Sequence, residues 1–223
     1  MMRLLAIDTS TWWGGAALVE TAAGDPRVVA EIGLRVEDSH AAHALAIVEA
    51  LLAAAGWDKT SLDAYVAVRG PGSFTGIRVA MGLARGLGLA AQRPCIGIGT
   101  LDAMAEAFGP ASTERVPLLD AGRGEVYGAR FDAVSTPPRV LSGPWVATPD
   151  AALTGGEGIV FGTGAERHRD ALLSAGYRGV IGRSPTSVAA GAARIASTLP
   201  GDGSDRDFTP LYVRPPDAEL PRR

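Results

Sequence analysis

The sequence is poor in the residues that build most catalytic and metal centres. It has one cysteine, Cys95, one lysine, Lys59, and three histidines in 223 residues. A single cysteine excludes an intramolecular disulfide, and the apolar run around Cys95 predicts an inert core thiol in a reducing compartment. The sequence has no Cys-x-x-Cys pair, His-Glu-x-x-His string or Ser-His-Asp order, so the common zinc and hydrolase signatures are missing.

Excess charge and long apolar runs are missing as well. A net charge of −3 argues against a protein that binds nucleic acid by itself. The first apolar run, Leu4–Ile7, is too short for a signal peptide and ends at an acid. No uninterrupted apolar run reaches the roughly 20 residues that a membrane span needs. We therefore expect a cytoplasmic protein with no membrane contact, and the 47% hydrophobic content predicts a well-packed core.

What the sequence does have is a Gly-rich turn, Arg69–Arg78, with the letters RGPGSFTGIR. It follows a strand-like run, Tyr65–Val68, and opens a helix-like run, Thr75–Ala91. The free backbone N–H groups at such a helix start suit an anion, often a phosphate. No Lys follows the glycines, which excludes a Walker A loop. The alternative is a tight turn whose glycines serve packing, and the local pattern leaves both open.

The first half of the chain predicts the element order βββ-α-β-α-β and then a further short helix. The expected elements are Leu4–Ile7, Gly14–Val19, Arg27–Val36, His40–Ala55, Tyr65–Val68, Thr75–Ala91, Pro94–Ile98 and Thr100–Phe108. The first strand ends at Asp8-Thr9-Ser10. This resembles the start of the actin and sugar-kinase superfamily, where such an acid approaches phosphate or its metal. Asp and Ser are also ordinary turn formers.

Two helices of this half are apolar on more than one face. In His40–Ala55 one seam runs from Ala41 to Ala55 and another from Ala44 to Ala54, whereas an outer helix of a single domain needs only one. Gly82, Gly86 and Gly88 lie within the Thr75–Ala91 helix, and each is unfavourable by about 1 kcal/mol relative to Ala. We therefore predict a helix-pair surface that docks on another helix pair. The predicted interface residues are Ala44, Ile47, Leu51, Gly76, Val79, Gly82, Leu83 and Gly86.

The second half repeats the outline less clearly, which predicts an internal duplication. Its expected elements are Val116–Asp120, Glu125–Phe131, a strand within Pro137–Val146, Pro149–Leu153, Gly158–Gly162, Ala165–Ala175, Val180–Ile181 and Thr186–Leu199. The segment Gly109–Thr113 is the predicted boundary, with one ribonuclease-H-like half at residues 1–109 and the other at 110–223. The Pro-rich tail from Phe208 is expected to be extended or disordered at its end.

Several polar residues allow two interpretations. Asp8 and Asp120 end corresponding strands, where two facing carboxylates suit Mg²⁺ or simply cap turns. We expect His40 and His43 to be solvated and His168 to be exposed. Arg123 and Glu125 are expected to pair across a turn. At least one of Trp12 and Trp13, in the first hairpin, should be partly exposed.

Four strings in order resemble the TsaB family, also called YeaZ. They are Leu5–Ser10, the Gly-rich turn Arg69–Arg78, Asp120–Tyr127 and Pro210–Arg214, and together they span almost the whole chain. The middle string is highly specific, and the second half otherwise matches weakly. The resemblance implies an α/β fold of two ribonuclease-H-like halves in the actin/sugar-kinase superfamily.

The resemblance also implies a function in tRNA modification. TsaB-like proteins are non-catalytic dimerisation subunits that work with TsaD and the ATPase TsaE. The complex transfers threonylcarbamoyl from threonylcarbamoyl-AMP to N6 of the adenosine 3′ of the anticodon in tRNAs that read codons beginning with A. TsaD carries a His-x-x-x-His metal pair whose positions fall on Thr100 and Met104 here. Neither residue is a useful ligand for iron or zinc, so no metal and no catalysis are expected.

The implied partners are a TsaD-like subunit, a TsaE-like ATPase and, for the lone protein, a second copy; tRNA is met only through the complex. No cofactor is required, and ATP or ADP is compatible with the interface of the complex. A relic phosphate site would consist of Asp8, Thr9, Ser10, Gly72 and Ser73. The alternative function is that of an ATP-dependent kinase or metallopeptidase of the same superfamily. The segment around Pro137–Pro149 is hard to align with the family.

Overall fold

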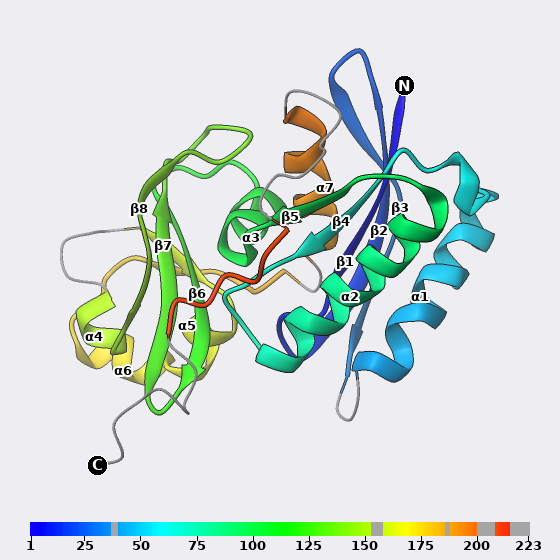
Figure 1. Cartoon of the computed structure of the whole chain (residues 1–223). Helices are drawn as coiled ribbons and strands as arrows, with labels where there is room; N and C mark the ends of the chain where they lie inside the picture. Colours follow the sequence, from blue (N-terminus) through cyan, green and yellow to red (C-terminus); the bar gives the residue numbers. More distant parts are fainter. Residues whose placement is uncertain (37–39, 153–157, 186–187, 200–207, 215–223) are drawn as a thin grey trace.

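The computed structural model describes residues 1–36, 40–152, 158–185, 188–199 and 208–214. These residues form two five-stranded sheets with helices on both sides of each (Figure 1). The first sheet has the strand order β3-β2-β1-β4-β5, and the second has β8-β7-β6-β9-β10. Each strand therefore has a counterpart at the same place in the other sheet. The fold is α/β, with two ribonuclease-H-like halves of the actin/sugar-kinase superfamily.

The first half follows the predicted order. Its elements are β1 (Met2–Asp8), β2 (Trp13–Ala22), β3 (Asp25–Arg35), α1 (His40–Ala55), the 3-10 turn η1 (Lys59–Ser61), β4 (Ala64–Val68), α2 (Phe74–Ala91), β5 (Cys95–Ile98) and α3 (Thr100–Phe108). The helix bounds match the predicted ones to within one residue. The strands β1 and β2 are longer than expected because their antiparallel pairing continues away from the turn, through Arg3 and Glu20 to Met2 and Thr21.

The first sheet is buried on both faces, as its nearly continuous apolar strands require. Successive side chains of β1 alternate between two cores: Leu4 and Ala6 point to one, Leu5 and Ile7 to the other. The helices α1 and α2 cover the second of these faces, and α7 (Ala189–Thr198) covers the first.

The second half has shorter elements. They are β6 (Arg115–Gly122), β7 (Glu125–Phe131), β8 (Val140–Ala147), α4 (Pro149–Ala152), β9 (Ile159–Phe161), α5 (Thr163–Arg167), α6 (Arg169–Ser174), β10 (Val180–Ile181) and α7. The single helix predicted over Ala165–Ala175 is wrong, because two short helices meet at His168, whose φ of −103° and ψ of 21° interrupt the regular turn.

The last described helix of each half, α3 in the first and α7 in the second, packs toward the opposite sheet. The helix α7 contacts all five strands of the first sheet, whereas α3 contacts β6 and β7 of the second. The two helices also contact each other, and a Cβ on Gly191 of α7 would collide with the carbonyl oxygen of Ala103 on α3. The pair α3–α7 thus forms a central layer between the sheets (Figure 1). Nothing tests the boundary near residue 109, which stays a prediction.

Among the described residues, no helix combines the length and the apolar character that crossing a bilayer would require.

Candidate functional site

A cleft of about 280 Å³ lies between the two halves. One wall is the end of β1 and the Gly-rich turn, and the other is made by β6, β7 and the start of α5. Its lining residues are Ser10, Thr11, Trp12, Gly72, Ser73, Leu119, Asp120, Ala121, Tyr127 and Thr163. Of the five predicted phosphate-site residues, Ser10, Gly72 and Ser73 line this cleft. Asp8 and Thr9, each 2% exposed, do not.

The glycines of the turn are explained by close backbone packing. A Cβ on Gly72 would collide with the carbonyl oxygen of Ser10, and one on Gly76 with the carbonyl oxygen of Thr9. A Cβ on Gly70 would meet the carbonyl oxygen of Leu211, from the far end of the chain. The turn is therefore pressed against the end of β1 on one side and against the C-terminal segment on the other.

The amide donors that a phosphate would use are partly engaged within the chain. The N–H of Ser73 donates to the carbonyl oxygen of Ser10 at 2.7 Å. The N–H of Gly76 donates to Oγ of Ser73 at 3.2 Å, so Ser73 caps α2 itself. The Thr9 hydroxyl donates to the Gly76 carbonyl at 2.6 Å. These contacts match the packing interpretation of the turn and fit a phosphate cradle poorly.

Asp8 lies in a separate, smaller cavity. Its carboxylate accepts the Ser10 N–H at 2.8 Å, and the cavity is also lined by Thr11, Thr100 and Met104. Burial raises the pKa of Asp8 to about 6, although the Ser10 hydroxyl and amide oppose this shift. Thr100 and Met104 thus line this cavity beside the acid with a hydroxyl and a thioether. Among the described residues, no group of three or more His, Cys, Asp or Glu side chains could hold a metal.

Asp120, the counterpart of Asp8 at the end of the β6 core run, opens onto the cleft instead. Its carboxylate pairs with Arg167 at 2.7 Å and accepts the Gly122 N–H at 3.1 Å. His168 lies 3.5 Å from the same carboxylate, with its side chain only 16% exposed. The prediction of an exposed His168 is therefore wrong: the break between α5 and α6 turns the imidazole toward Asp120. Because Asp8 and Asp120 line different cavities, the geometry does not support one shared Mg²⁺ site.

Other single residues fall mostly where the sequence placed them. Trp12 is 40% exposed, as predicted for this hairpin, and His43 is exposed. Cys95 is only partly buried; its Sγ donates to the Ala84 carbonyl at 3.4 Å, and burial raises the pKa of the thiol. Glu125 pairs with Arg214, a partner that sequence reasoning missed because 89 residues separate the two. Only the family-like string Pro210–Arg214 pointed to that end of the chain.

The predicted docking surface needs a correction. Ala44, Ile47 and Leu51 of α1 and Gly76 of α2 are buried within this chain, so they have no surface to offer a partner. Val79 and Leu83 are partly buried, and Gly82 and Gly86 are exposed. A Cβ on either exposed glycine would meet nothing within 4 Å.

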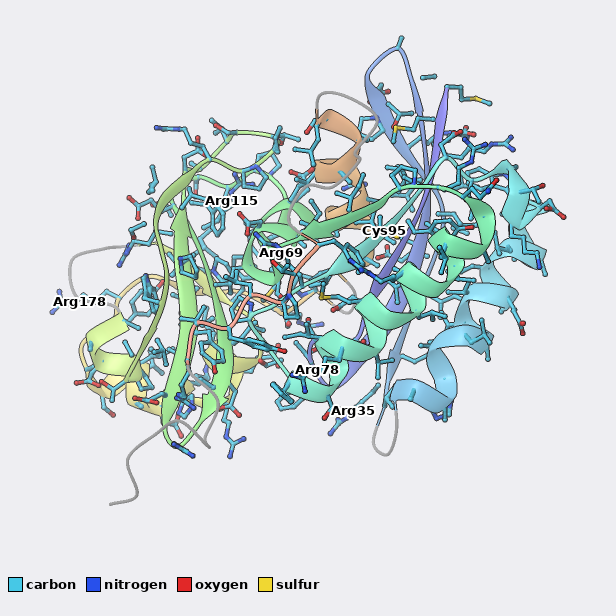
Figure 2. All side chains as sticks on the ribbon, in the orientation of Figure 1. Arg35, Arg69, Arg78, Cys95, Arg115 and Arg178 are labelled. Carbon is cyan, nitrogen blue, oxygen red and sulfur yellow. The ribbon has the colours of Figure 1, made fainter. Side chains whose placement is uncertain are left out.

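The residues predicted on α1 therefore do not form the outer face of α1 and α2; other residues do. Leu45 of α1 is 46% exposed and Leu89 of α2 is 80% exposed. Two arginines, Arg78 and Arg85, lie on the exposed side of α2, and Figure 2 labels Arg78 near the start of that helix. This outer face, defined by Leu45, Gly82, Gly86 and Leu89, combines two exposed leucines with two exposed glycines, and Arg85 lies between those glycines.

A family model and several named relatives of this chain point to the same family. The family model described as "TsaD: tRNA N6-adenosine threonylcarbamoyltransferase" matches residues 34–159, more than half of the chain. The tRNA threonylcarbamoyladenosine biosynthesis protein TsaB of Escherichia coli K12 is 39% identical over 132 residues, which cover 58% of this chain and 55% of that protein. The Bacillus subtilis TsaB is 32% identical over 126 residues, which cover 56% and 53%.

A fuller match comes from a protein without an assigned function and from a solved structure. An uncharacterized protein of Mycobacterium tuberculosis H37Rv is 31% identical over 220 residues, covering 97% of this chain and 93% of that one. The structure of YeaZ from Pseudomonas aeruginosa superposes with a TM-score of 0.75 at 26% identity, covering 95% of this chain and 100% of that chain. The chain spans about half the length of the curated TsaB relatives it matches. The chain belongs to the TsaD family of that model and, within it, to the TsaB (YeaZ) family.

Proposed function

We propose that this protein is a non-catalytic docking subunit of the machinery that makes threonylcarbamoyladenosine in tRNA. It would pair with a TsaD-like catalytic subunit and act with a TsaE-like ATPase. The complex would transfer threonylcarbamoyl to N6 of the adenosine 3′ of the anticodon in tRNAs that read codons beginning with A. The names of the TsaB relatives support the pathway. The observation that carries the docking role is the outer face of α1 and α2, where two exposed helical glycines have nothing within 4 Å.

Those glycines make sense when a second helix pair approaches. Glycine weakens a helix by about 1 kcal/mol relative to Ala, and at Gly82 and Gly86 no contact within the chain offsets that loss. A missing side chain lets another backbone come close, and Leu45 and Leu89 would supply apolar area around that contact. In the lone protein the same face would meet a second copy, giving a homodimer.

The residues found in place of the histidine pair of TsaD support the non-catalytic role. Thr100 and Met104, at the positions where TsaD would hold its metal, are 0% and 2% exposed, and neither side chain is a useful ligand for iron or zinc. The net charge of −3 fits a subunit that meets tRNA only through its partners. We also propose that the protein requires no cofactor, and that the interface of the complex is the place where ATP or ADP would bind.

The first test is the mass, by size-exclusion chromatography with light scattering, of the protein mixed with its TsaD counterpart. We expect a heterodimer, and we expect Gly82→Leu to abolish it and to leave the lone protein monomeric. Ala171→Leu is the matched control, since Ala171 is exposed on α6 in the other half. Loss of the complex in both variants, or in neither, would reject this interface.

ATP turnover and the response to metal distinguish an enzyme from a docking subunit. A kinase of the same superfamily should hydrolyse ATP slowly without a partner, and Asp8→Asn should remove that activity. A metallopeptidase should respond to added divalent metal. We expect neither response. Failure to form any complex, together with ATP hydrolysis by the lone protein, would replace the docking role by the kinase.

A further inference from the structure

The segment Phe208–Arg214 crosses from one half of the molecule to the other. Figure 1 shows it in red, running from beside α3 and β5 across to the second sheet. Although the chain has already completed both sheets before this point, the segment makes hydrogen bonds and ring contacts with both halves. Among the described residues that follow α7, this segment alone contacts both walls of the cleft.

Its first half is hydrogen-bonded to the Gly-rich turn. The Leu211 N–H donates to the Arg69 carbonyl at 2.7 Å, and Arg69 Nη1 reaches the Thr209 carbonyl at 3.5 Å. Figure 2 labels Arg69 beside this segment. The absence of a side chain at Gly70 makes room for the Leu211 carbonyl. Since Gly72 and Ser73 follow directly, the segment is attached to the wall of the cleft that the first half provides.

Aromatic rings attach the same segment to α2. The ring of Tyr212 lies 5.3 Å from that of Phe74, between centroids. The guanidinium of Arg78 lies 3.5 Å from the centroid of Phe74 and 6.0 Å from that of Tyr212. Arg85 lies 5.2 Å from the ring of Phe208. These ring and cation–π contacts hold the segment along α2, from Phe74 in its first turn to Arg85.

The end of the segment is attached to the opposite wall. Arg214 donates to the Ala121 carbonyl at 2.9 Å and forms an ion pair with Glu125. Its guanidinium also lies 5.7 Å from the ring centroid of Tyr127. Ala121 and Tyr127 both line the cleft. The side chain of Arg214 is only 15% exposed, so this ion pair is better shielded from water than an ordinary surface pair.

We propose that residues 208–214 form a latch that fixes the separation of the two cleft walls. The cleft has no other covalent or hydrogen-bonded bridge at this edge among the described residues. With the latch attached, the walls stay at the spacing that gives the cavity of about 280 Å³. When the latch is released, the two halves can rotate about the α3–α7 layer, and the cleft opens.

The test measures the distance between two spin labels, one in each half, by double electron–electron resonance. In a Cys95→Ala background, spin labels would be placed by Glu49→Cys on α1 and Asp170→Cys on α6, both exposed positions. The latch is released by Tyr212→Ala combined with Arg214→Met. We expect the distance distribution to broaden and to shift to longer distances in the released protein.

Arg178→Met is the matched control, because Arg178 is an exposed arginine of the second half outside the latch (Figure 2). It should leave the distribution unchanged. Should the double variant not fold, Tyr212→Ala alone, which keeps the Arg214 ion pair, takes its place. Hydrogen exchange is a second readout: amides at 69–78 and 120–127 should exchange faster, while those of α7 keep their rate. An unchanged distance in a folded released variant would overturn the latch, and so would faster exchange confined to residues 208–214.

Discussion

At the scale of single residues, Asp8 should make the free energy of unfolding depend on pH. Its pKa is raised by burial from 3.8 to about 6, so the folded state binds this proton more tightly than the unfolded state. The stability it contributes is fully present below about pH 3.8 and is lost as the pH rises through about 6. By linkage the loss is on the order of 3 kcal/mol.

We expect urea denaturation between pH 4 and 7.5 to show this loss in the wild type. In Asp8→Asn the corresponding slope should be absent, because the amide has no proton to release in this range. The variant should therefore gain stability relative to the wild type as the pH rises. Parallel pH profiles for the two proteins would contradict the raised pKa.

Arg115 is the other residue whose burial has a large consequence. Its side chain is 0% exposed, and Figure 2 shows it between the halves. It donates to the carbonyl oxygens of Ala105, Gly109, Asp132 and Ser135, at 2.8 to 3.2 Å. It also contacts the Asp132 carboxylate at 3.3 Å. One guanidinium thus joins the end of α3 to the turn after β7.

Arg115→Met should lower the free energy of unfolding by about 3–5 kcal/mol, since it leaves buried carbonyl groups without donors. Arg139→Met is the control, because Arg139 approaches the same Asp132 carboxylate at 3.5 Å but is 70% exposed. That change should cost less than about 1 kcal/mol. Thermal and urea unfolding of both variants measure the difference, and equal losses would show that burial is not the cause.

At the scale of elements, the glycines of α2 divide into two kinds. A Cβ at Gly76 would collide with the Thr9 carbonyl, whereas one at Gly82 would meet nothing within 4 Å. Gly76→Ala should therefore destabilise the lone protein, by more than 1 kcal/mol, and Gly82→Ala should stabilise it by about 0.5–1 kcal/mol through helix propensity. Differential scanning calorimetry of both variants at a concentration where the protein is monomeric tests this. A Gly82→Ala variant that loses stability there would mean that its face is already occupied.

The helices also show how far sequence reasoning reaches. The ends of α1 and α3 were predictable because a local signal sets them: a glycine, Gly56 or Gly109, follows the last residue of each helix. Which seam of α1 faces the sheet was not predictable. Both seams are apolar, so periodicity gives no preference, and the one predicted to face outward, with Ala44, Ile47 and Leu51, is the buried one.

The candidate site was only partly predictable for a related reason. The Gly-rich turn was found from its own letters, because glycine positions in a strand–turn–helix are local information. The Arg214–Glu125 pair and the approach of His168 to Asp120 depend on how distant segments meet, and no spacing in the sequence encodes them. The packing of α7 on the first sheet is the largest contact of this kind.

At the scale of the whole molecule, the packing of α7 on the first sheet and of α3 on the second makes the two halves depend on each other. The face of the first sheet that carries Leu4 and Val66 is covered by α7, which lies beyond residue 188 in the chain. A fragment of residues 1–109 would leave this face bare to water, and the lost burial would remove roughly 25 cal/mol of stabilisation for each Å² of exposed apolar area. We therefore expect this fragment to lack a cooperative unfolding transition by circular dichroism.

Mixing the fragments is the sharper part of this last prediction. Residues 110–223 added in trans should restore a cooperative transition, because they bring α7 to the first sheet. Residues 110–187, which end before α7, should not restore it, although they keep every strand of the second sheet. A cooperative melt of residues 1–109 alone would mean that the first half is an independent folding unit, and that α7 adds to its stability without being needed for its fold.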